Sequence, residues 1–163
     1  MRAVPAVLAA LVTTAALLTG CGVGPSGVEA AGPAPGGVAP GTTLYFVGQD
    51  GALRPELRET GRLGTVVDAL ALLLTGPGPA SDLTTAIPGP PAPVPVVAAR
   101  VTSIEIWLPF TAAEVPATGV DQIVCTALGV HRQSGGDPAA TVQIRFTVPE
   151  PGSDRPRECP IPG

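Results

Sequence analysis

The chain opens on an uncharged apolar run, and a regular alternation of apolar and polar residues begins only after residue 41. Residues 3–18 contain no charged side chain, and a single arginine, Arg2, precedes them. A short basic head followed by an apolar stretch is the pattern of a secretory signal peptide. The sequence therefore predicts an export signal over residues 1–20.

The apolar run ends in Leu18-Thr19-Gly20-Cys21, which resembles the lipobox of bacterial lipoproteins. In proteins with that motif the cysteine thiol takes a diacylglyceryl group, and the signal peptide is cut off before the cysteine. The resemblance implies cleavage between Gly20 and Cys21 and a palmitate-type lipid on Cys21. Two acyl chains hold a protein at a bilayer persistently, whereas one chain holds it only marginally. We therefore expect a protein of the cell envelope, lipid-anchored at the extracytoplasmic face of the cell membrane.

Two other interpretations of this segment stay open. About 18 uncharged residues are nearly enough to span a bilayer as a retained helix. Alternatively, the protein is secreted in the ordinary way, and Cys21 is an incidental thiol. The Gly- and Pro-rich stretch that follows Cys21 favours the anchor, because a tether belongs at that place and a continuing helix does not. Residues 21–41 are accordingly predicted to be a flexible, lipid-anchored linker.

After the linker, several segments have the composition or the alternation of β-strands. In one of them Pro55 indicates an edge strand or a bulge, because proline cannot donate to a sheet ladder. The strictest alternation is in the last of them. The predicted strands are residues 43–47, 52–58, 96–103, 104–110 and 141–148.

Two segments predict helices. Residues 66–74 are apolar nearly all round, and Thr65 and Asp68 have the spacing of a capping box at their start. A segment of that length is too short to cross a membrane, so we expect a buried helix packed on a sheet. A second helix is expected over residues 120–128, with Asp121 near its positive end.

Strands that come in pairs around two helices indicate an α+β fold and not a regular βαβ series. The expected architecture is a small, mostly antiparallel sheet packed against two helices, preceded by the signal peptide and the flexible linker. Residues 42–148 form the predicted domain, and residues 149–163 form a Pro-rich C-terminal tail.

Four short stretches carry a family resemblance: residues 44–53, residues 67–77, Ala86-Ile87-Pro88 and residues 122–128. In order and spacing they resemble the opening hairpin, the first helix, a short central element and the second helix of the GerMN domain family. That family is a module of bacterial sporulation, germination and cell-envelope lipoproteins. The resemblance implies an α+β module of non-enzymatic, adaptor-like character, whose partner is an envelope protein or a cell-wall component.

Charge and cysteine content narrow the possibilities further. The chain of 163 residues has a formal net charge of −4, and its nine basic residues are scattered arginines. The sequence thus has no basic stripe, and we expect no nucleic-acid partner. There are three cysteines. With Cys21 lipidated, Cys125 and Cys159 remain as an even pair in an oxidising compartment, and we expect a disulfide that pins the tail to the second helix. The alternative is two free thiols, with Cys125 a small core residue.

The candidate chemistry is sparse. His131 is the sole histidine, and Ser134 and Asp137 follow it in one glycine-containing stretch. A catalytic triad needs its members brought together with an oxyanion hole, so we expect an exposed turn there. No zinc cluster, EF-hand or P-loop spacing is present. We therefore expect no catalytic residue, no bound metal and no cofactor.

The charged residues after the first hairpin allow two interpretations. Arg54, Arg58 and Arg62 are spaced by four and interleaved with Glu56 and Glu59. We expect a solvated face, and the alternative is a contact with an anionic polymer or a lipid headgroup. The acids Glu56, Glu59 and Asp50 are at most weak calcium ligands.

The sequence thus predicts a lipid-anchored binding or accessory module of the cell envelope that is not an enzyme. We expect it to assist envelope signalling or cell-wall machinery. Two rivals remain: a small envelope hydrolase that uses His131, and a solute-binding lipoprotein of a transporter.

Overall fold

The first sheet is a hairpin, shown by a computed structural model that describes residues 41–89 and 95–161. The predicted signal peptide, Gly20, Cys21 and the predicted linker up to residue 40 lie outside the described residues. Strand β1 (Thr42–Val47) pairs antiparallel with β2 (Leu53–Arg58). Gly51 closes the turn in the left-handed region, at φ 77°, where a side chain would be strained.

Pro55 fits into β2 because of its position in the ladder. It lies opposite Tyr45, whose N–H and C=O both bond to other parts of the chain, away from β2. The Tyr45–Pro55 pair is therefore one that exchanges no ladder hydrogen bonds, so the missing N–H of proline costs nothing there. The predicted edge strand is confirmed, since β2 pairs only with β1 among the described strands.

The second sheet has three strands, β3 (Val96–Ala99), β4 (Ser103–Trp107) and β5 (Thr141–Arg145), in the order β3-β4-β5. Strands β3 and β4 are antiparallel, whereas β4 and β5 are parallel. The α+β class with mostly antiparallel pairing is confirmed. The expectation of one sheet is wrong, because the described strands form two separate small sheets. The parallel pair also means that a single βαβ crossover is present, since parallel neighbours need a long connection.

All three strands of the second sheet are shorter than predicted. The first predicted strand stops before a turn in which the N–H of Arg100 donates to the carbonyl of Ser103 at 2.8 Å. The next ends at Trp107, two residues before Pro109, which has no N–H for a regular ladder. Beyond Arg145 the pairing continues only irregularly, with a 2.8 Å bond from the Thr147 N–H to the Phe110 carbonyl.

Helix α2 (Val66–Leu74) has the bounds that its sequence predicts. The Thr65 hydroxyl accepts from the N–H of Asp68 at 3.2 Å, and the Asp68 carboxylate accepts from the N–H of Thr65 at 2.9 Å. The predicted capping box is thereby confirmed. The expectation that this helix is wholly buried is wrong, because only one of its faces is buried.

Helix α3 (Ala117–Gln133) is longer at both ends than predicted. It begins after Pro116, whose side chain makes no capping hydrogen bond, so the sequence carries no polar cap to mark the start. Asp121 is consequently the fifth residue of the helix, and no acidic residue lies in the first turn. The expectation that Asp121 sits at the positive helix end is therefore wrong.

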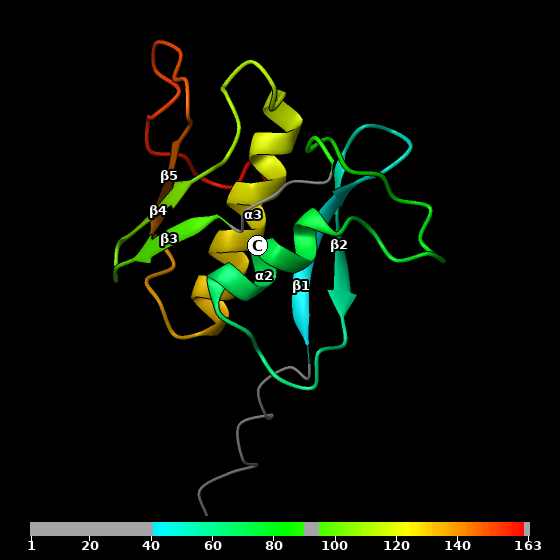
Figure 1. Cartoon of the computed structure of the whole chain (residues 1–163). Coiled ribbons are helices and arrows are strands. Elements are labelled where there is room, and N and C mark those ends of the chain that lie inside the picture. Colours follow the sequence, from blue (N-terminus) through cyan, green and yellow to red (C-terminus); the bar gives the residue numbers. More distant parts are fainter. Residues whose placement is uncertain (1–40, 90–94, 162–163) are drawn as a thin grey trace, which may run out of the picture. The chain divides into compact units, whose positions relative to one another are not determined.

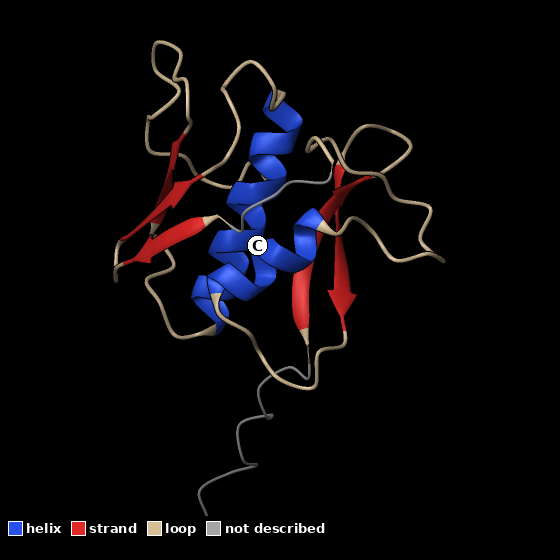
Figure 2. Cartoon of the chain, viewed as in Figure 1, coloured by secondary structure: helices blue, strands red, loops and turns tan. Residues whose placement is uncertain are grey.

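The core is organised around α3, which contacts β1 and α2 as well as β5. Figure 1 and Figure 2 show this helix between the three-stranded sheet and the β1–β2 hairpin, and α2 packs across it with contacts to β1 and β3 as well. Most of its side chains are buried because it is covered from both sides. The fully buried side chains that surround it are Leu44, Phe46, Leu73, Ile104, Ile106, Val142 and Ile144.

Candidate functional site

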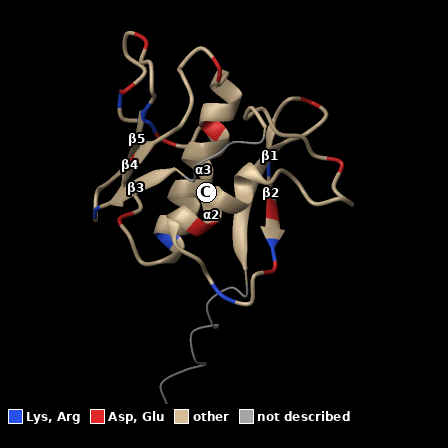
Figure 3. Ribbon diagram, viewed as in Figure 1, with Lys and Arg blue, Asp and Glu red and all other residues tan. Residues whose placement is uncertain are grey.

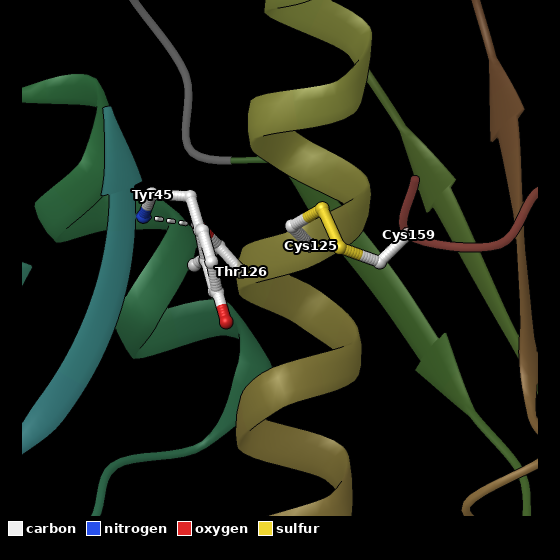
Figure 4. The surroundings of a disulfide bond; sticks show 4 residues. All are labelled: Tyr45, Cys125, Thr126 and Cys159. Carbon is white, nitrogen blue, oxygen red and sulfur yellow. Dashed lines mark hydrogen bonds between the residues drawn. A yellow bond between two sulfur atoms is a disulfide. The ribbon is translucent and has the colours of Figure 1, made fainter. Parts of the chain in front are cut away.

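A disulfide ties the C-terminal segment to the central helix. The sulfurs of Cys125 and Cys159 are bonded at 1.98 Å, with 4.7 Å between the two Cα atoms (Figure 4). Two residues earlier, Arg157 forms an antiparallel bridge with Val142 of β5, with N–H to carbonyl distances of 2.8 and 2.9 Å. The predicted pairing of these cysteines is thus present. The segment after Val148 is attached to the domain at both α3 and β5.

A polar clamp on α3 closes the free edge of the first hairpin. Thr126 accepts from the N–H of Tyr45 at 3.1 Å (Figure 4), and the side-chain amide of Gln122 donates to the carbonyl of Tyr45 at 3.0 Å. The same Gln122 side chain accepts from the N–H of Ala86 at 2.7 Å. Both Gln122 and Thr126 are fully buried. They satisfy backbone groups that would otherwise be buried without partners.

His131 lies in α3 and is 8% exposed, so the expectation of an exposed turn is wrong. Its Nε2 is 3.0 Å from the carbonyl oxygen of Val101, and because a carbonyl can only accept, Nε2 carries the hydrogen. A side chain at Gly136 would lie 2.2 Å from this nitrogen. The prediction was wrong because it ended the helix at Leu128. The helix continues to Gln133, and this places His131 in the core.

The other two members of the hypothetical triad have local partners. The hydroxyl of Ser134 donates to the carbonyl of Val130 at 2.8 Å and closes the end of the helix. The carboxylate of Asp137 accepts from the N–H of Ala139 at 2.8 Å. All three side chains, including that of His131, thus form hydrogen bonds with backbone groups and not with one another. The arrangement seen here is that of a helix terminus.

Arg54 and Arg62 are exposed, whereas Arg58 is half-buried; Figure 3 marks the positions of the acidic and basic residues along the ribbon. Arg54 pairs with Asp50 at 2.6 Å, and Arg58 pairs with Glu56 at 2.9 Å while also donating to the carbonyl of Gly76 at 3.1 Å. A hydrogen bond from the N–H of Ala52, followed by that from Arg54, lowers the pKa of Asp50. These contacts occupy the first two arginines of the series.

The same contacts bear on the weak calcium hypothesis. Burial alone would raise the pKa of Glu56, but hydrogen bonds from Ser81, Gly78 and Arg58 outweigh it and lower that pKa. The Glu56 carboxylate is thus engaged by protein donors. Within residues 41–89 and 95–161, no group of three His, Cys, Asp or Glu side chains could hold a metal ion.

A groove of about 400 Å³ lies along the outer face of α2. Its lining includes Arg62, the third arginine of the series, and the sequence alone did not indicate it. One signal was available: Thr42 is a polar residue at the head of an otherwise apolar, buried row, Thr42, Leu44 and Phe46. The full lining is Thr42, Thr60, Arg62, Gly64, Asp68, Ala71, Leu72 and Thr75.

Among the residues that the structure describes, no helix has the length and apolarity needed to cross a membrane. The described residues form an α+β domain with a disulfide between α3 and the C-terminal segment and with a groove along α2.

Comparison with known proteins adds one likeness. The chain matches no protein-family model, and no curated protein matches it. A similar solved structure is that of the tandem GerMN domains of the sporulation protein GerM from Bacillus subtilis, at 16% sequence identity and a TM-score of 0.48. The match covers 81% of this chain and 49% of that chain, so this chain spans about half its length. A likeness at this level does not establish the family, and the GerMN resemblance stays a prediction.

Proposed function

We propose that this protein is a lipid-anchored accessory module at the extracytoplasmic face of the cell membrane. Cys21 is the lipidated residue, cleavage falls between Gly20 and Cys21, and the domain binds another envelope component without catalysing a reaction. The GerMN-like order of elements in the sequence supports the accessory role.

The Cys125–Cys159 disulfide is the observation that carries this proposal. Disulfides form and persist outside the cytoplasm and are rare within it. An exported protein needs an export signal, and residues 1–20 have the pattern of one. The pairing also uses two of the three cysteines, which leaves Cys21 as the thiol available for lipid.

The surroundings of His131 support the non-catalytic part of the proposal. The histidine is buried, and its Nε2 hydrogen is committed to the carbonyl of Val101. A general base must reach the proton that it removes. We therefore expect His131→Ala to weaken the fold without abolishing any turnover, and activity profiling with ester and amide probes on the wild type and this variant checks it. A probe reaction that the variant selectively loses would support the hydrolase instead.

Replacing Cys21 with Ala tests the anchor. Cells fed a clickable palmitate analogue should label the wild-type protein and leave Cys21→Ala unlabelled, because only a thiol forms the thioether. Ser26→Ala is the matched control, since it changes a small residue close by and leaves the lipobox intact; it should label like the wild type. Labelling of the Cys21→Ala protein, or no labelling of the wild type, would refute the anchor.

A further inference from the structure

The C-terminal segment, residues 149–161, forms a strap along the outer edge of β5 and onto α3 (Figure 1). A backbone bridge between Arg157 and Val142 holds the strap to β5, and the Cys125–Cys159 bond holds it to α3. Strand β5 lies at the end of its sheet, so this edge has no neighbouring strand among those described. The strap therefore covers an edge whose backbone groups would otherwise be open to another chain.

Apart from the disulfide, a few polar contacts join the strap to the rest of the domain. The bridge consists of two N–H to carbonyl bonds of 2.8 and 2.9 Å. The side-chain amide of Gln143 donates to the carbonyl of Asp154 at 2.6 Å, and Arg145 pairs with the Asp154 carboxylate at 3.2 Å. The two side chains of this ion pair are 37% and 54% exposed, and such exposed pairs contribute little to stability.

The strap is also loosely packed against the domain. A cavity of about 150 Å³ lies between the strap and β5, and its lining includes Ile144 and Ser153. A second cavity, of about 210 Å³, lies between the strap and the start of α3. Side chains that face an unfilled space lose dispersion contacts. In addition, Nε of Arg157 is buried with no hydrogen-bond partner among the described residues, and a buried donor without a partner opposes the docking of the strap.

The hydrophobic core does not need the strap. Of the described residues after Phe146, only Cys159 packs against the core cluster. Holding the strap in place costs conformational entropy at each ordered residue, and the few polar contacts are weak compensation. The disulfide keeps Cys159 beside Cys125 whatever these contacts contribute, because a tethered segment has a high effective concentration at its site. The position of the strap therefore depends on the covalent bond.

We propose that the Cys125–Cys159 bond is a redox latch: its reduction releases the strap and uncovers the edge of β5 at Val142, while the domain stays folded. Cys159 is the sulfur that a reductant reaches, because this residue is half-buried whereas Cys125 is 1% exposed. The latch does not depend on the lipid anchor at Cys21. A failure of lipid labelling would therefore leave the latch standing, and a failure of the latch would leave the anchor standing.

A dithiol is the class of reductant that opens the latch. One thiolate of the dithiol attacks the Cys159 sulfur and forms a mixed disulfide, while the Cys125 sulfur leaves as a thiolate. The second thiol of the reductant then attacks the mixed disulfide, closes the reductant's own disulfide and releases the Cys159 sulfur. The dithiol loses two electrons and two protons, and the two cysteines gain them as thiols.

NMR spectra of the full chain in detergent, recorded before and after the addition of dithiothreitol, test the latch. Reduction should move the resonances of Asp154 and Arg157 to the positions of an unstructured peptide and shift the amide resonance of Val142, which loses its acceptor. The resonances of Leu44 and Phe46, both in the core, should keep their native positions. Strap resonances that stay in place would overturn the proposal. Loss of the native Leu44 and Phe46 positions would overturn it too, because reduction would then unfold the domain.

Digestion with trypsin, which cuts after arginine, measures the release of the strap without a reductant. The double variant Cys125→Ala, Cys159→Ala should be cut after Arg157 roughly tenfold or more faster than the oxidised wild type, because cleavage follows the population of the open state. Dithiothreitol should leave the rate of the double variant unchanged. Cys21→Ala is the matched control, since it removes the third cysteine and keeps the latch; it should be cut as slowly as the wild type. A double variant that is cut as slowly as the wild type would show that the strap does not need the bond.

Discussion

Helices α2 and α3 differ in how deeply they are buried, and the difference is the reverse of what the apolar content of their sequences suggests. Helix α2 contains one charged residue among nine, yet Ala71, Leu72 and Leu74 are only partly buried. Helix α3 carries Gln122, Thr126 and other polar side chains, yet most of it is buried. The helix with the more polar sequence therefore has the more buried position.

Position between layers explains this difference. Helix α3 contacts both β1 and β5, so each of its faces meets protein. Its polar side chains form hydrogen bonds with backbone groups of the neighbouring segments, so they are not left without partners when they are buried. Helix α2 contacts α3, β1 and β3 but buries only one face, and its outer face lines the groove. Polar groups in α3 thus fix the packing, whereas apolar groups in α2 remain available for contact.

Removing the disulfide should lower the free energy of unfolding more than any other change considered, because this bond anchors α3 and closes a long loop. The two cysteines are 34 residues apart, and a loop of that length contributes about 3–4 kcal/mol in the chain-entropy model. The double variant Cys125→Ala, Cys159→Ala should lose about that much free energy of unfolding in urea. Reductant should destabilise the wild type similarly and leave the double variant unchanged. A wild type indifferent to reductant would contradict the role of this bond.

Within α2, the two faces should respond differently to the same truncation. Leu73 is fully buried, and Leu73→Ala should lower the free energy of unfolding by about 3 kcal/mol through the cavity that it leaves. Leu72, on the groove side, is partly exposed, and Leu72→Ala should cost about 1 kcal/mol or less. Chemical denaturation of the two variants measures both. Equal losses would mean that the outer face of α2 is covered after all.

Replacing Gln122, a member of the polar clamp in α3, with an apolar residue should lower the free energy of unfolding. Gln122→Leu keeps the bulk of the side chain but leaves the carbonyl of Tyr45 and the N–H of Ala86 without their partner, at a cost of about 2 kcal/mol. Gln133→Leu, the same substitution at the exposed end of α3, should change stability by less than about 0.5 kcal/mol. Urea unfolding compares them, and a neutral Gln122→Leu would show that the clamp does not hold β1.

The smallest expected effect is a pH dependence in α3. Burial raises the pKa of Asp121, and the charge of Arg157 opposes this shift only in part. The folded state then holds the proton more tightly than the unfolded state, so stability falls as pH rises above 3.8, the ordinary value for Asp. Asp121→Asn should therefore raise the melting temperature at pH 7. The difference should vanish below pH 3.8, and a lower melting temperature of Asp121→Asn at pH 7 would contradict this assignment.

Local signals made part of the fold predictable. The start of α2 follows from Thr65 and Asp68, and its end from Gly76-Pro77, because caps and breakers act over a few residues. The start of α3 lacks such a signal, since Pro116 makes no side-chain cap. The parallel pairing of β4 with β5 joins residues on either side of a whole helix, and no local pattern encodes it.

Some features of the candidate sites were likewise predictable from the sequence, and others were not. The Cys125–Cys159 pair was predictable by counting, because assigning one of three cysteines to the lipid leaves two. The burial of His131 was not, since it depends on where α3 ends. The groove brings Thr42, Arg62 and Thr75 together from separate elements, and only the position of Thr42 in a buried row hinted at it.

Mass analysis of the N-terminal fragment of the protein, isolated from its own membranes, tests the proposed lipid on Cys21. We expect a chain that begins at Cys21 and carries a diacylglyceryl group on that residue. A chain that begins elsewhere, or an unmodified thiol at position 21, would contradict it.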